Sequence, residues 1–136
     1  MTIFTPHAPI SWGELIDKIT ILEIKKKNIA APKALININK ELNLLNKIAD
    51  EHITHKNIEE LKLKLKEINF KLWKIEDDIR ELEYKKTFDE NFIKLARSVY
   101  LKNDERAKIK REINEILKSE LKEEKSYKNF RGHEIS

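Results

Sequence analysis

Hydrophobic positions recur at helical spacing along nearly the whole chain, and short polar connectors separate four such stretches. The first stretch follows Ser11 and Glu14, which have the spacing of a helix-capping box. The second follows Pro32, a residue that suits the first turn of a helix. The pattern therefore predicts helices over residues 12–29 and 33–53.

The third and fourth stretches are longer than the first two. The third predicts a helix over residues 57–86, and the fourth, which follows a second capping pattern at Thr87 and Glu90, predicts one over residues 88–124. A short connector makes this pair an antiparallel hairpin. We therefore expect an all-α antiparallel bundle of about four helices. In domain terms the chain divides into an extended arm at 1–10, one helical domain at 11–124 and a tail at 125–136.

The helix expected at 57–86 carries hydrophobic residues on two sides. One seam runs from Ile58 to Leu82, and a second stripe consists of Leu63, Phe70, Trp73 and Tyr84. A helix that is apolar on two sides is expected to pack on both. Helices of this length also often extend beyond the core of one chain, so dimerisation is one interpretation. The predicted core comprises Leu15, Ile19, Leu22, Leu65, Ile68, Leu72, Ile75, Ile79, Val99, Ile113 and Leu117.

Composition supports the fold class and narrows the kinds of site. Two glycines and three prolines are too few for the many turns of a sheet protein. The chain has no cysteine, which excludes disulfides and thiolate metal sites, and its four histidines form no convincing metal set. No apolar run is long enough for a membrane span, and the first residues lack a signal-peptide pattern. We expect a cytoplasmic protein without metal, cofactor or membrane contact.

The net charge of +4 is a small excess of 28 basic over 24 acidic residues, which alternate along the helices. Such interleaving is typical of a solvated, ion-paired surface, whereas nucleic-acid binders concentrate basic residues in a stripe. The only basic runs are residues 25–27 and the tail after Lys125. The charge pattern therefore disfavours nucleic acid as a partner, although nucleic-acid binding remains a further alternative.

A polar patch interrupts the apolar face of the helix expected at 88–124. Asn103, Arg106 and Lys110 fall near the middle of the stripe that contains Val99 and Ile113. Charged groups occupy comparable positions on the helices expected at 12–29 and 57–86, and the candidate ligand-binding residues are Asn103, Arg106, Lys110, Lys26, Glu23 and Glu76. Two interpretations stand side by side. Either these groups pair with one another structurally, or they line a pocket that binds an anion, with Glu23 or Glu76 holding the cations.

Four blocks of sequence resemble a bacterial family of short helical proteins catalogued as a domain of unknown function. They are ISWGELIDKITILEIK from residue 10, LWKIEDDIR from residue 72, FIKLARSVYLKNDERAKIKREIN from residue 92 and EEKSY from residue 123. The resemblance covers residues 10–127 and implies a helical fold. It supplies no activity or catalytic residues to carry over.

The sequence contains no catalytic motif of the common kinds, such as a glycine-rich phosphate loop or a Ser-His-Asp grouping. This favours a non-enzymatic module that associates with itself or binds a protein partner. The alternative is a binder of small anions, or an enzyme, that uses the Asn103, Arg106 and Lys110 face. Nucleic-acid binding is the second alternative.

Overall fold

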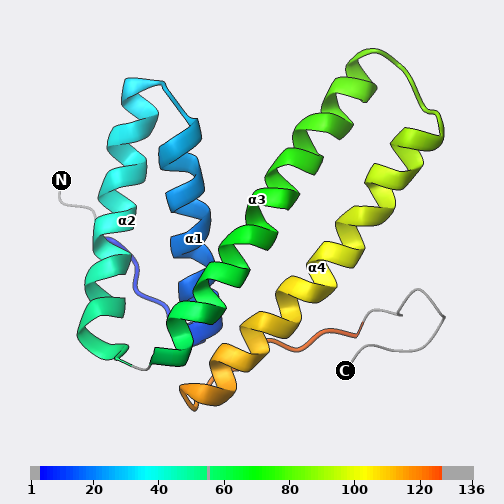
Figure 1. Ribbon diagram of the computed structural model, residues 1–136. Helices are drawn as coiled ribbons and strands as arrows, with labels where there is room; N and C mark the ends of the chain where they lie inside the picture. Colours follow the sequence, from blue (N-terminus) through cyan, green and yellow to red (C-terminus); the bar gives the residue numbers. More distant parts are fainter. Residues whose placement is uncertain (1–3, 55, 127–136) are drawn as a thin grey trace.

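Four α-helices account for most of residues 4–54 and 56–126, which are the residues that the computed structural model describes (Figure 1). In chain order they are α1 (Trp12–Asn28), α2 (Pro32–His52), α3 (Lys56–Tyr84) and α4 (Glu90–Ile116). The described residues contain no strand, which confirms the all-α prediction. None of these helices has both the length and the apolar character that a membrane span requires.

The first two helices begin where their capping signals lie, whereas α4 begins later than predicted. Ser11 Oγ accepts a hydrogen bond from the backbone N–H of Glu14 at 3.1 Å, as expected for the N-cap of α1. At the fourth helix the cap is Asp89 rather than Thr87. The Asp89 carboxylate accepts from the N–H of Phe92 at 3.1 Å, while the Thr87 hydroxyl is turned to the Lys85 carbonyl at 3.4 Å.

The predicted end of the last helix at residue 124 was wrong, because α4 stops at Ile116. Lys118 adopts a left-handed backbone conformation with φ of 52°, and the N–H of Ser119 closes the end on the Asn114 carbonyl at 2.8 Å. The chain then turns back along α4 as far as Glu123 and beyond (Figure 1). The helical spacing of the hydrophobic residues after 116 therefore does not reflect a helix.

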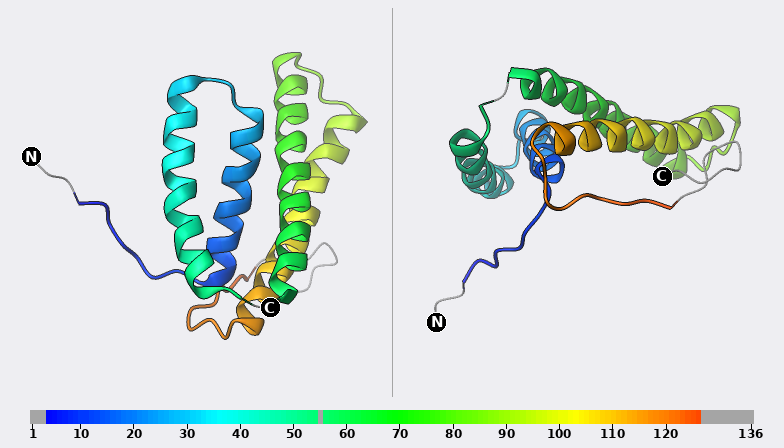
Figure 2. Two further views of the ribbon diagram at one scale, coloured as in Figure 1. Left: turned by 60° about the vertical axis from the view of Figure 1, so that its left-hand side comes forward. Right: turned by 90° about the horizontal axis from the view of Figure 1, so that it is seen from below.

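The helices form two hairpins, α1–α2 and α3–α4, that meet at one end and diverge at the other (Figures 1 and 2). Helix α1 packs against each of the other three helices, whereas α2 packs against α1 alone. The outer part of the α3–α4 hairpin consequently has no third helix beside it. The view from below in Figure 2 shows this hairpin extending away from α1 and α2.

The core lies where the hairpins meet, and it contains about half of the residues that the sequence predicts to be buried. Six of the eleven predicted positions are buried: Leu15, Ile19, Leu22, Leu65, Ile68 and Ile113. The other five are only half-buried: Leu72, Ile75, Ile79, Val99 and Leu117. Three of these five lie in the diverging part of the hairpin, where α3 and α4 face only each other, and Leu72 lies at its start, in a groove shared with Ile21 and Ile24 of α1. No residue from 70 to 109 is buried, so the hairpin does extend beyond the core.

The second stripe of α3 is uncovered, contrary to the expectation that both sides of this helix pack. Leu63, Phe70 and Tyr84 are exposed, and Trp73 is half-buried. The reason is topological, because α2 stays on the far side of α1 and never reaches α3.

Candidate functional site

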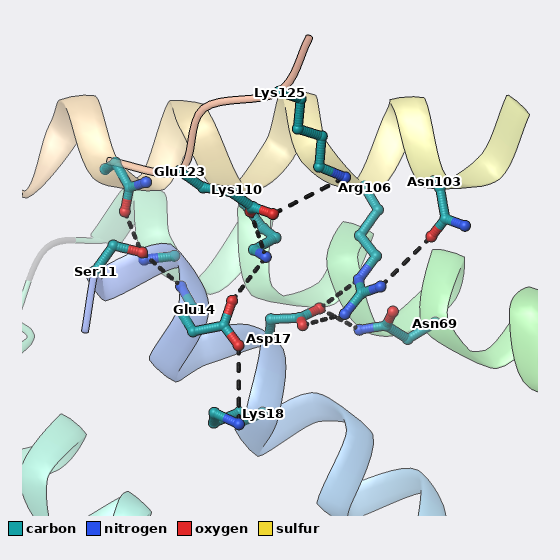
Figure 3. A network of polar contacts seen from close by, with 12 residues as sticks. Ser11, Glu14, Asp17, Lys18, Asn69, Asn103, Arg106, Lys110, Glu123 and Lys125 are labelled. Carbon is teal, nitrogen blue, oxygen red and sulfur yellow. Dashed lines mark hydrogen bonds and ion pairs between the residues drawn. The ribbon is translucent and has the colours of Figure 1, made fainter. Parts of the chain in front are cut away.

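A cluster of polar side chains joins α1, α3 and α4 beside the core (Figure 3). At its centre Asp17 of α1, only 1% exposed, forms a bidentate ion pair with Arg106 of α4. Arg106 Nε donates to Asp17 Oδ1 at 2.9 Å, and Arg106 Nη2 donates to Oδ2. Asn69 of α3 donates from Nδ2 to the same Oδ1 at 2.9 Å and to Thr20 Oγ1 at 2.9 Å. Asp17 therefore ties three helices together.

Asp17 is ionised despite its burial. Desolvation alone would raise the pKa of a carboxyl group in this position. Hydrogen bonds from Arg106 and Asn69, together with the positive charges of Arg106 and Lys110, outweigh that effect and lower the pKa of Asp17 below its ordinary value. The same pairing raises the pKa of Arg106. The central pair is thus a salt bridge between a buried carboxylate, whose oxygens accept several hydrogen bonds, and a half-buried guanidinium.

Lys110 forms the second centre of the cluster, one turn further along α4. Its Nζ donates to Glu14 of α1 at 2.8 Å and to Glu123 of the returning segment at 2.7 Å. Burial lowers the pKa of Lys110, but the hydrogen bonds to Glu123 and Glu14 outweigh burial and raise it. Lys18 contacts the other oxygen of Glu14 at 3.8 Å. Lys110 is therefore a buried ammonium neutralised from two sides.

The start of α1 lies directly against the end of α4. Gly13 N–H donates to Asn114 Oδ1 at 2.7 Å, and Trp12 N–H donates to Ser119 Oγ at 3.2 Å. The first N–H groups of a helix have no partner within that helix, so side chains from the end of α4 satisfy them here. Gly13 permits this approach, because a Cβ at that position would lie 2.5 Å from the Lys110 carbonyl oxygen.

This packing predicts whether replacing Gly13 by alanine raises or lowers the free energy of unfolding. Alanine usually stabilises a helix relative to glycine by about 1 kcal/mol. At Gly13 the added methyl group would push on the backbone of Lys110, which cannot turn aside as a side chain can. We expect Gly13→Ala to lower the free energy of unfolding by about 1–3 kcal/mol, measured by urea denaturation. A more stable variant would contradict the close approach of α1 and α4.

The structure brings together three of the six candidate residues. Asn103, Arg106 and Lys110 lie in the cluster, and Asn103 Oδ1 accepts from Arg106 Nη1 at 3.4 Å. The other three lie elsewhere. Glu23 pairs with Lys62 and Lys66 of α3, each at 3.2 Å; Lys26 is exposed; and Glu76 pairs with Arg80 at 2.8 Å on the surface of α3.

The expectation that Glu23 or Glu76 holds the cations of α4 was wrong, because Asp17, Glu14 and Glu123 do so. Asp17 lies off the stripe formed by Leu15, Ile19 and Leu22, and a single stripe marks one buried face. Helix α1 is instead surrounded by three helices, so its other sides are covered as well. In the structure only one of residues 11–24, Lys18, is exposed, and no pattern in the sequence marks this.

The charged groups of the cluster are paired with one another. Each of its two central cations already has at least one internal carboxylate, and each carboxylate has at least one cation. Such an arrangement positions helices but leaves little charge to attract an external anion. Within the described ranges, no group of three or more histidine, aspartate or glutamate side chains is placed to hold a metal ion.

Comparison with known proteins gives a family and no activity. A search of the curated proteins found no match, and neither did a search of the solved structures. A family model described as "Family of unknown function (DUF6165)" matches residues 7–132, which is most of the chain. The chain therefore belongs to this family of unknown function, DUF6165.

Proposed function

We propose that the protein is a non-enzymatic self-associating module, and that two copies pair through the outer part of the α3–α4 hairpin. We call this part, residues 77–103, the distal hairpin. The observation that carries the proposal is its lack of any buried residue despite many hydrophobic side chains. Two helices can shield only the seam between them, and a second such pair would complete a four-helix bundle.

Large hydrophobic side chains remain accessible on both helices of the distal hairpin. On α3, Tyr84 is 84% exposed; on α4, Ile93 is 54% exposed and Tyr100 is 41% exposed. Behind them a half-buried seam includes Ile79 and Val99. Large exposed apolar patches mark interaction sites in soluble proteins.

The charges of the distal hairpin favour a second copy as the occupant. Residues 77–83 of α3 contain four acidic residues and one basic residue, whereas residues 91–103 of α4 contain three basic residues and no acidic one. The ion pairs found here are local to one helix or its turn, as in Glu81–Lys85 and Glu83–Lys86. In an antiparallel pair of hairpins, the acidic helix of each copy can face the basic helix of the other, an arrangement that two-fold symmetry allows.

The polar cluster supports this proposal in an indirect way. Asp17, Arg106 and Asn69 fix α1 across the lower halves of α3 and α4. The α1–α2 hairpin is thereby held on one side, and it does not fold over the distal hairpin (Figure 1). A rigid scaffold that presents an uncovered helical pair is what a self-associating module needs.

Sedimentation velocity with matched variants tests the proposal. We expect the wild-type chain to dimerise with rising concentration. The double variant Ile93→Glu and Tyr100→Glu should weaken that dimer at least about tenfold, because it places two charges in the interface. Both side chains are exposed in one chain, so circular dichroism should show unchanged helix content.

The control is a double variant on α2, Ile36→Glu and Leu44→Glu. These side chains are 67% and 54% exposed, which makes them as accessible as the pair on α4, but they lie on the other hairpin. The control should dimerise like the wild type. A wild-type chain that stays monomeric at several hundred micromolar would overturn the proposal, and so would equal disruption by the control.

A further inference from the structure

We propose that a groove between α1, α3 and α4 binds a small uncharged molecule, one whose flat apolar body carries a carboxamide or lactam edge. The groove has a volume of about 230 Å³. Its hydrophobic lining consists of Ile21, Ile24, Leu72 and Trp73. Its polar lining consists of Asn69, Arg106 and Glu76. Apolar walls around a few polar groups are the usual composition of a small-molecule site.

The orientation of Asn69 is determined by its neighbours. Its Nδ2 donates to Asp17 Oδ1 and to Thr20 Oγ1, each at 2.9 Å. Thr20 Oγ1 donates its own hydrogen to the Asp17 carbonyl at 2.8 Å, so toward Asn69 it can only accept. The carboxamide therefore cannot be flipped without losing both bonds. Both bonds use Nδ2, so the side-chain oxygen Oδ1 is the polar atom of Asn69 that remains to accept a hydrogen bond from a ligand. The residue is only 6% exposed.

Arg106 supplies donors beside that acceptor. A guanidinium group has five N–H bonds. Arg106 directs two of them to Asp17 and one to Asn103, so two remain, and Arg106 is one of the residues that line the groove. An N–H donor pair next to a carbonyl acceptor matches a ligand edge that presents a C=O beside an N–H. Carboxamides and lactams have such an edge.

The charged residues that line the groove are already paired, which disfavours an anionic ligand. Asp17 neutralises Arg106, and Arg80 neutralises Glu76. A carboxylate would therefore gain no net attraction, and one of its oxygens would meet the Asn69 oxygen. The groove is also smaller than the 300 Å³ or more of typical drug-sized sites, which favours a single ring. The indole of Trp73 offers that ring a flat apolar surface.

Titration of the ¹⁵N-labelled full chain with three matched probes tests this inference. The probes are benzamide, N,N-dimethylbenzamide, which lacks the N–H donor, and benzoate, which is charged. Benzamide should cause saturable shifts of the Trp73 indole and the Asn69 side-chain amide, and should leave the Trp12 indole unchanged. The two other probes should bind at least about threefold more weakly, the effect expected for one lost hydrogen bond.

A comparison of two variants on α3 tests whether benzamide binds in this groove. Trp73→Ala should weaken benzamide binding at least about fivefold, because it removes an aromatic wall. Phe70→Ala is the control, since Phe70 is exposed on α3 but does not line this groove. Equal affinity for the three probes, preference for benzoate, no saturable shift at Trp73, or equal effects of the two variants would each overturn the inference. None of these results depends on dimerisation.

Discussion

Replacing Arg106 by leucine should lower the free energy of unfolding by about 3–5 kcal/mol. The change removes the only cation that contacts the Asp17 carboxylate within hydrogen-bond distance in the described chain, and leaves that carboxylate 1% exposed. Asn69 would remain as its one side-chain donor. A buried charge that loses its partner retains the cost of desolvation without the compensating attraction. Denaturation by urea, followed by far-ultraviolet circular dichroism, measures the loss.

Two further variants show whether the loss comes from the pair itself. The double variant Asp17→Asn and Arg106→Leu carries no stranded charge and should recover a large part of the lost stability. Arg97→Leu removes an exposed arginine from the same helix and should change stability by no more than about 0.5 kcal/mol. If the double variant were as unstable as the sum of its single changes, the two residues would not be coupled.

The pH dependence of stability follows from the lowered pKa of Asp17. A carboxyl group with a lowered pKa contributes stability that is fully present above its unfolded-state pKa of about 4 and is lost as pH falls through the folded pKa. The wild type should therefore lose stability below about pH 4 more steeply than the Asp17→Asn variant. Lys110 acts in the opposite direction, because its pKa is raised. Its contribution is present below about pH 10 and is lost as pH rises further.

The elements of this fold follow from local signals, whereas the arrangement of its hairpins does not. Ser11 and Pro32 mark helix starts because capping depends on a few neighbouring residues. The predicted end of α4 was too late because the hydrophobic spacing continues to Leu121, whereas the helix ends before Lys118, whose backbone is left-handed, and Ser119 contacts α1. A contact between residues a hundred positions apart leaves no local pattern.

The candidate site illustrates the same limit. Arg106 and Lys110 were recognisable, because charged groups on an apolar stripe must find partners. Their partner Asp17 was not, because burial of its side of α1 depends on that helix lying among three others. Periodicity shows which residues of a helix share a face. It does not show how many faces are covered.

Two leucines one heptad apart on the same stripe of α3 should respond differently to the same substitution. Leu65 is fully buried where the hairpins meet, so Leu65→Ala should lower the free energy of unfolding by about 2–5 kcal/mol. Leu72 is half-buried where the hairpins begin to diverge, so Leu72→Ala should cost less than half as much. The spacing of hydrophobic residues predicts equal losses, and the divergence of the hairpins predicts unequal ones.

Urea denaturation at a protein concentration below the dimer range decides between them. Equal losses would mean that α1 closes over the upper part of α3 in solution, which would also remove the uncovered surface on which self-association depends.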